Sequence, residues 1–392
     1  MKILCLSFRT PPQIRPQAIL IGKMIPEWIR QGAEPIIITY DGGEWRPGAL
    51  VYKIPTPKIS PRFYQLPIIG SLLENLYYRK LFRLILGIIK KHSPSLIFSF
   101  SNPQASNLLG ARLKKKTGLP FVSHFSDPWY LHPFLNFSPK KNRKIYSQEK
   151  FVIENSDRVV FVNDVLEEYT MKNHPSSWRE KCRIVPHCFD KKDYPVKPEV
   201  KNKKFTFSHI GAFYPQRNPE IFLKAFSKIF ARRPELKQKI KIELVGATNA
   251  YAGYDSKKLN GLLDGYNLNS VAEIIPQVSY LESLGRMTAS NCLFVIDADI
   301  PGSMFLPSKA IDYAGSGTPI IGLTPKDSPT EKFLAGLGCP SFHYDQIEAL
   351  EKTLEKIISG EMIIRINKDF ISQFQVESTT EKLLYVFKEV LA

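Results

Sequence analysis

The sequence lacks long apolar runs. Nowhere in its 392 residues do about 18 apolar residues follow one another, so no transmembrane helix is expected. The apolar start, Met1–Phe8, is interrupted too soon by Arg9 and several prolines to be a secretory signal. These two absences predict a cytoplasmic protein.

Cysteine is scarce as well. The five cysteines are odd in number and form no C-x-x-C pair. This usage argues against a disulfide framework and against a zinc site, and it predicts a reducing compartment.

Acidic residues are sparse in the first half. Residues 1–200 contain 31 of the 54 Lys and Arg residues but only 16 of the 37 Asp and Glu residues, so they carry nearly all of the net charge of +17. Such an imbalance predicts an anionic partner: membrane lipid, a phosphate-bearing acceptor or nucleic acid. Nucleic acid is the least expected, because no recognition motif and no basic–aromatic pattern on strands is present.

What the sequence does contain is an alternation of strands and helices, which occurs twice. Apolar strands separated by amphipathic helices predict parallel sheets covered on both faces. In the first half, strands are expected at 3–8, 35–39, 95–99, 120–123, 158–162 and 182–186, and helices at 18–31, 71–91, 105–117, 144–155 and 165–174.

The second α/β unit begins at Phe205, after a polar stretch at 191–204 that is typical of a linker. Its strands are expected at 205–211, 240–245, 272–275, 292–297, 319–323 and 339–343, and its helices at 219–230 and 281–290. We therefore predict two doubly wound domains, 1–195 and 205–378, that face each other across a cleft. A last helix at about 379–392 is expected to pack back on the first domain.

One stretch, Pro307–Ile321, predicts a binding site. A helix should begin near Ser308 and end before Gly317-Thr318-Pro319. Its first turn would offer backbone N–H groups to an anion, next to the charge of Lys309, while Asp312 lies one turn further on. This combination suits a nucleotide diphosphate and its ribose. An ordinary helix–strand turn is the alternative interpretation.

Together with other segments, this stretch resembles the family-4 type of retaining, nucleotide-sugar-dependent glycosyltransferases with the GT-B fold. The resemblance spans nearly the whole chain. It implies that the first domain binds the acceptor and the second binds an NDP-sugar donor. The segments that carry it are the opening strand-loop-helix, 118–120 with 126–129, 185–190, 211–220, 244–246 and 307–321.

The resemblance assigns donor-binding roles in the second domain. Arg217 would bind the donor diphosphate and stabilise the leaving group, with Lys309 as a second cation. Asp312 stands at the second carboxylate of the family's E-x7-E motif and would accept hydrogen bonds from ribose hydroxyls. The remaining donor-binding residues implied are Gly211, Gly246, Met304, Phe305, Leu306 and Ser308.

The sequence departs from the family pattern at Met304, where the first carboxylate of that motif is expected. Sugar recognition should differ here, with the backbone N–H groups of 302–306 serving the sugar and phosphate. Asp297-Ala298-Asp299 has the D-x-D form that holds a metal in other glycosyltransferases. Because GT-B enzymes generally need none, no metal and no cofactor are expected besides a UDP- or GDP-linked sugar.

Acceptor-side residues are expected in the first domain, where 126–129 follow a strand end. Asp127 would position or deprotonate the acceptor hydroxyl, near Trp129. His124 is either a further acceptor contact or a packed core histidine. Arg9 and Arg15 follow the first strand and are expected to bind the acceptor or phosphate.

Membrane contact is predicted for 62–80 and for the basic run 140–144, which combine apolar or aromatic residues with cations. These segments would hold the protein at the inner face of the plasma membrane. The acceptor is then expected to be a polysaccharide or lipid-linked saccharide. Two other functions stay open: a non-catalytic scaffold relative, suggested by Met304, and a sugar-nucleotide epimerase.

Overall fold

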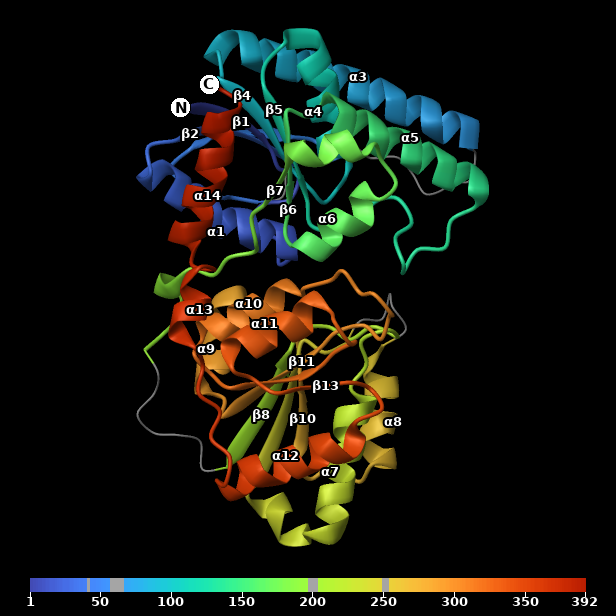
Figure 1. Cartoon of the computed structure of the whole chain (residues 1–392), viewed down its shortest axis with the longest axis vertical. Helices are drawn as coiled ribbons and strands as arrows, with labels where there is room; N and C mark the ends of the chain where they lie inside the picture. The colour runs from blue at the N-terminus through green and yellow to red at the C-terminus, as the bar shows by residue number, and fades with distance from the viewer. Residues whose placement is uncertain (41–42, 57–66, 197–203, 249–253) are drawn as a thin grey trace. The chain divides into compact units, whose positions relative to one another are not determined.

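The computed structural model describes the whole chain except residues 41–42, 57–66, 197–203 and 249–253. The chain forms two α/β units. Unit 1 is Met1–Pro186 together with Val376–Ala392, and unit 2 is His187–Gln375 (Figure 1). The predicted pair of doubly wound domains is confirmed.

The sheet of unit 1 has its first strand near the centre. All neighbouring strands run parallel, in the order β3-β2-β1-β4-β5-β6-β7. Both faces are covered by helices, so the strands are almost wholly apolar. The strands are β1 Lys2–Leu6, β2 Glu34–Tyr40, β3 Leu50–Ile54, β4 Leu96–Phe100, β5 Phe121–Phe125, β6 Arg158–Phe161 and β7 Cys182–Ile184.

Several helices of unit 1 begin at a proline or after a capping side chain. Ser138 caps the helix that starts at Pro139, by accepting a hydrogen bond from the Lys141 N–H. That helix was expected only from residue 144. The helices are α1 Pro16–Arg30, α3 Pro67–His92, α4 Ala105–Thr117, α5 Pro139–Asn155, α6 Asp164–Met171 and α14 Val376–Glu389. A 3-10 turn follows at Ser176–Lys181, and another, Lys191–Asp193, belongs to unit 2.

Helix α14 completes the core of unit 1, although unit 2 separates it in sequence from the rest. The Phe387 ring packs edge-on against Trp28 of α1, with centroids 5.6 Å apart, and lies 5.1 Å from Phe98 of β4. Glu389 bridges Arg158 and Arg183, each at 2.9 Å. These contacts fix the returning chain to the first sheet.

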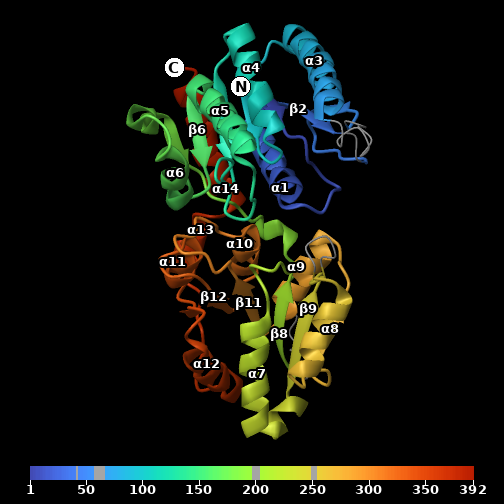
Figure 2. The same cartoon turned by 90° about the vertical axis from the view of Figure 1, so that its right-hand side faces the viewer.

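Unit 2 holds a second parallel sheet, in the order β10-β9-β8-β11-β12-β13. Helix α7 runs beside this sheet in Figure 2. The strands are β8 Phe205–Ile210, β9 Ile240–Val245, β10 Ala272–Ile275, β11 Cys292–Ile296, β12 Ile320–Leu323 and β13 Ser341–Phe342. The helices are α7 Glu220–Arg232, α8 Ser256–Gly265, α9 Tyr280–Ala289, α10 Ser308–Gly315, α11 Pro329–Leu337, α12 Ile347–Ser359 and α13 Lys368–Ser372, with a 3-10 turn at Pro234–Gln238.

The division between the units lies at Pro186 instead of residue 195, because the next residues pack into unit 2. Phe189 is buried there, and its N–H donates to the Phe374 carbonyl at 3.0 Å. The Tyr194 hydroxyl donates to the Asp312 carbonyl at 2.8 Å. Most of the remaining predicted linker, 197–203, lies outside the described residues.

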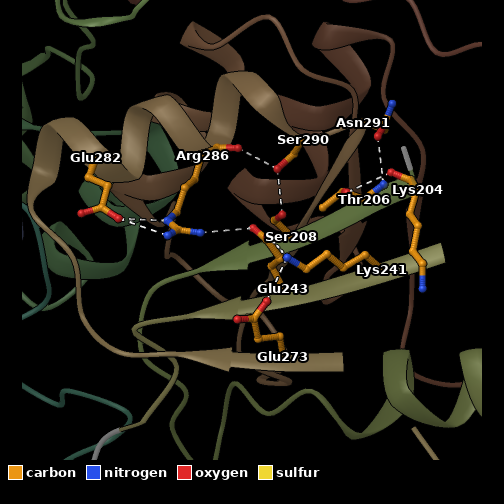
Figure 3. Close-up of polar contacts among 10 residues, drawn as sticks. All are labelled: Lys204, Thr206, Ser208, Lys241, Glu243, Glu273, Glu282, Arg286, Ser290 and Asn291. Atoms are coloured by element: carbon orange, nitrogen blue, oxygen red, sulfur yellow. Dashed lines mark hydrogen bonds and ion pairs between the residues drawn. The ribbon is translucent and has the colours of Figure 1, made fainter. Parts of the chain in front are cut away.

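The second sheet carries a charged network on the side that faces α9 (Figure 3). Lys241 lies 2.7 Å from Glu243 and 2.9 Å from Glu273, while Arg286 of α9 lies 3.1 Å from Glu282 and 3.7 Å from Glu243. Glu243 is nearly buried and is neutralised by two cations. The network adds an ionic contact between α9 and β9 to the apolar packing of Leu284 and Met287, and it joins β9 to β10.

Several elements differ from the sequence prediction. Strand β3 and helices α8, α11 and α12 were not predicted. Strand β3 is the edge of its sheet and only Ile54 in it is buried, so it lacks the continuous apolar signal of a buried strand. Among the described helices, none is long and apolar enough to cross a membrane.

Candidate functional site

In unit 2, the start of α10 meets the end of β8. Helix α10 begins at Ser308, as predicted, and the Lys309 ammonium lies 3.2 Å from Nε2 of His209. Gly211 follows the strand with φ +126°, and a Cβ built there would lie 2.8 Å from the Lys309 Nζ. Glycine is favoured here because L side chains rarely adopt this φ, and the Lys309 side chain also occupies the space beside it.

Arg217 supplies a second cation from the loop between β8 and α7. Its Nη2 lies 3.3 Å from Oδ1 of Asp297, at the end of β11, and its guanidinium stands 5.3 Å from the centre of the Phe305 ring. The Arg217 side chain is 21% exposed, whereas Asp297 is fully buried. The ion pair with this buried carboxylate therefore fixes the position of the Arg217 guanidinium.

The two acids of the D-x-D segment lie in different surroundings. Asp297 accepts hydrogen bonds from the Ala298 N–H at 2.8 Å and from the Thr330 hydroxyl at 2.9 Å, while Asp299 is exposed. Burial raises the pKa of Asp297, and Arg217 opposes that rise. Within the described ranges, no group of three or more His, Cys, Asp or Glu side chains could hold a metal ion.

Electrostatics make the Lys309 site unusual. Burial, and then repulsion from Arg217, lower the pKa of Lys309 to about 7. Burial, and then the charge of Lys309, hold the pKa of His209 well below its usual value. His209 is therefore a neutral imidazole at physiological pH, and Lys309 gains or loses its charge near neutrality.

The rest of the predicted donor set surrounds this start of α10. Met304 and Phe305 are buried, and Leu306 and Ser308 are partly exposed. Asp312 is 7% exposed and accepts a hydrogen bond from the Tyr280 hydroxyl of α9 at 3.2 Å. This contact holds the shorter carboxylate in one orientation.

Gly246 follows β9 as Gly211 follows β8. It has φ +59°, its N–H donates to the Ile275 carbonyl at 2.8 Å, and a Cβ there would meet the Gln277 backbone at 3.6 Å. Both glycines lie at the carboxyl ends of neighbouring parallel strands, where ligands bind in such sheets.

In unit 1, the predicted acceptor residues lie after β5. Asp127 accepts hydrogen bonds from the Asn102 amide at 2.7 Å and from the Ser126 hydroxyl at 3.2 Å. Trp129 is partly exposed. Asn102 follows β4, so the ends of two neighbouring strands position this carboxylate.

His124, Arg9 and Arg15 are placed differently. His124 is 5% exposed and stacks on Phe100, with ring centroids 4.4 Å apart, which favours its packed-core alternative. The Arg9 guanidinium lies 5.7 Å from the Tyr40 ring centre, and burial and then Arg15 lower its pKa. Arg15 is exposed just before α1.

Sequence reasoning missed the residues that support these groups. His209 was read only as part of a strand, Asp297 only as part of a possible metal motif, and Tyr280 was not considered. In unit 1, Glu149 of α5 accepts from the Tyr130 N–H at 2.9 Å and pairs with His174 at 3.0 Å. No local signal identifies such pairs, because the partners are distant in sequence.

Comparison with known proteins places this architecture. Residues 19–187 match the family model described as a glycosyl transferase 4-like domain. This match falls almost wholly within unit 1. Among curated protein sequences, none matches this chain.

Solved structures extend the likeness to the whole chain. Anabaena HepE in complex with UDP-glucose is similar with a TM-score of 0.72 at 15% identity, covering 99% of this chain and 100% of its own. The lipopolysaccharide outer core galactosyltransferase WaaB gives 0.66 at 14%, covering 99% of each chain. Sucrose-phosphate synthase from Thermosynechococcus elongatus gives 0.67 at 15%, covering 100% and 96%. The chain therefore has the GT-B fold of glycosyltransferases, and the predicted resemblance is confirmed.

Proposed function

We propose that this glycosyltransferase-type chain moves a sugar from a UDP-sugar to a saccharide or lipid-linked saccharide, with retention of anomeric configuration. The observation that carries the proposal is the pair of cations, Arg217 and Lys309, beside the start of α10. HepE, which is similar along its whole length, is known in complex with UDP and with UDP-glucose.

The site suits departure of a nucleoside diphosphate. When the bond between the anomeric carbon and the β-phosphate oxygen breaks, negative charge grows on that phosphate. Arg217 and Lys309 would stabilise this charge, as would the N–H groups of the first turn of α10. These two cations would supply the charge that a divalent metal supplies elsewhere, so we propose transfer without a metal or other cofactor.

The acceptor hydroxyl forms the new bond to the anomeric carbon and loses its proton. In our proposal the leaving phosphate takes this proton on the face from which it departs. Asp127 would orient the hydroxyl, because Asn102 and Ser126 hold its carboxylate in place. Asp312 would accept hydrogen bonds from the ribose hydroxyls.

The test is nucleotide release. We expect UDP to be released from at least one member of a panel of UDP- and GDP-sugars when a lipid-linked saccharide is present. Retention is read from the anomeric proton coupling of the product by NMR. Binding of nucleotide without turnover of any donor would favour the scaffold function suggested by Met304. Release of an epimerised sugar with no acceptor present would favour the epimerase.

A membrane-bound acceptor is supported by the surface of α3. Leu72, Leu76 and Leu84 are exposed there, beside the exposed cations Arg79 and Lys80. Lys140, Lys141, Arg143 and Lys144 are exposed at the start of α5, whereas 62–66 of the predicted segment lie outside the described residues. An apolar and cationic surface suits anionic lipid.

Liposome co-sedimentation tests this contact. We expect recovery with vesicles containing anionic lipid and little with neutral vesicles, and Leu76→Glu should reduce recovery. Glu154→Ala, an exposed change elsewhere in unit 1, is the control. Equal recovery on both vesicle types would contradict the proposal.

A further inference from the structure

The His209 side chain, which contacts the Lys309 ammonium, has no assigned role in the proposed reaction. His209 is 1% exposed, and its ring stacks on Phe213 with centroids 4.4 Å apart. Its Nδ1 lies 2.9 Å from the Phe294 carbonyl. A carbonyl can only accept, so Nδ1 carries the proton and Nε2 is left as an acceptor.

That acceptor faces Lys309. The ammonium lies 3.2 Å from Nε2, so it donates a hydrogen bond to the buried imidazole. A hydrogen bond to the charged form of lysine favours that form, against the burial and the Arg217 charge that disfavour it. The contact with His209 therefore places the ammonium and favours its protonated form.

The other titratable side chains around this pair are already engaged. Arg217 is paired with Asp297 at 3.3 Å, and Asp312 accepts from Tyr280. The Tyr313 hydroxyl donates to the Ile210 carbonyl at 3.0 Å.

We infer that His209 is a positioning residue for nucleotide binding: its neutral imidazole holds the Lys309 ammonium at the diphosphate site and couples UDP binding to uptake of a proton. The inference rests on the proposed function, since it takes a nucleoside diphosphate as the ligand. A bound diphosphate stabilises the ammonium, so a neutral Lys309 takes a proton from solvent as UDP binds.

The direction of the pH dependence follows. Lys309, whose pKa is about 7 in the free protein, has a higher pKa in the complex. Affinity is then greatest below pH 7 and falls as the pH rises above 7, roughly fivefold to tenfold per unit. The titration of UDP itself contributes little to this pH dependence above pH 7.5, because its terminal phosphate titrates near pH 6.

Calorimetric titration with UDP in two buffers of different ionisation enthalpy counts the protons. We expect the full-length protein to take up close to one proton per UDP at pH 8, and Lys309→Arg to take up none. His209→Phe should bind UDP about tenfold more weakly at pH 7 and begin proton uptake at lower pH. His209→Gln keeps an acceptor and should stay within threefold of the unmodified protein.

The outcomes separate the two proposals. UDP binding without proton uptake, or an unchanged pH profile in His209→Phe, overturns the role of His209 and leaves the donor site standing. Failure of the protein to bind any nucleotide overturns both. Thermal unfolding checks that His209→Phe folds, and His209→Met, which also removes the acceptor, replaces it if it does not.

Discussion

In each unit a buried histidine lies against a charged partner, and the sign of that charge separates the roles of His174 and His209. In unit 1, His174 lies 3.0 Å from the carboxylate of Glu149, with both side chains almost fully buried. In unit 2, His209 lies 3.2 Å from the ammonium of Lys309. Against a carboxylate the imidazole donates, whereas against an ammonium it accepts.

The two pairs also face different tasks. Glu149 uses its second oxygen to accept from the Tyr130 N–H, next to Trp129 and close to Asp127, so that pair fixes a loop. Lys309 stands at the start of a helix, where it can meet a ligand. A buried histidine can therefore either stabilise a loop, through a carboxylate that accepts a backbone N–H, or position an ammonium that can bind a ligand. Its charged partner determines which.

Breaking the unit 1 pair should have the largest effect. Glu149→Ala leaves a buried imidazole without its carboxylate and a loop N–H without its acceptor. We expect the free energy of unfolding to fall by about 3–5 kcal/mol, measured by denaturant titration. Glu154→Ala, exposed on the same helix, should change stability by less than about 0.5 kcal/mol. Similar losses of unfolding free energy in the two variants would show that the Glu149–His174 pair does not stabilise the unit.

Removing the second cation of unit 2 should weaken binding and also lower stability, because buried Asp297 loses its paired charge. Arg217→Ala deletes a charge held against buried Asp297, and we expect UDP binding to weaken by about 2–5 kcal/mol. Calorimetric titration measures the change. Exposed Arg233→Ala is the matched control. A titration with unchanged affinity would remove Arg217 from the site.

Asp312 of α10 should make the protein prefer nucleotides with ribose over those with 2′-deoxyribose. Asp312→Ala removes the proposed acceptor of the ribose hydroxyls, so the preference for UDP over 2′-deoxy-UDP should shrink by about 1.5–3 kcal/mol. Competition binding with both nucleotides measures it. If the preference persists in full, Asp312 serves only to anchor Tyr280.

The smallest expected change is backbone strain at Gly211. Gly211→Ala places a Cβ 2.8 Å from the Lys309 ammonium at a positive φ, so it should cost about 1 kcal/mol of stability and displace Lys309. Gly360 also has a positive φ, +80°, but open space around it, so Gly360→Ala should strain the chain without changing UDP affinity. Equal affinities in both variants would contradict the contact between Gly211 and Lys309.

Sequence alone predicted what depends on local pattern. The start of α10 at Ser308, the two parallel sheets and the loop of Arg217 all follow from caps, apolar runs and spacing along the chain. Edge strand β3 was missed because an exposed strand carries a weak apolar signal. The pairs Glu149–His174 and His209–Lys309 could not be predicted, because partners 25 and 100 residues apart meet only after folding.

The return of α14 to the first sheet has a consequence for synthesis on the ribosome. Residues 187–375, all of unit 2, must be translated before the helix that covers Trp28 and Phe98 emerges. At about 5–20 residues per second, this delay lasts roughly 10–40 s. During that interval Trp28 and Phe98 of the nascent first unit lack their Phe387 contacts, so its core can be completed only after the second unit has been made.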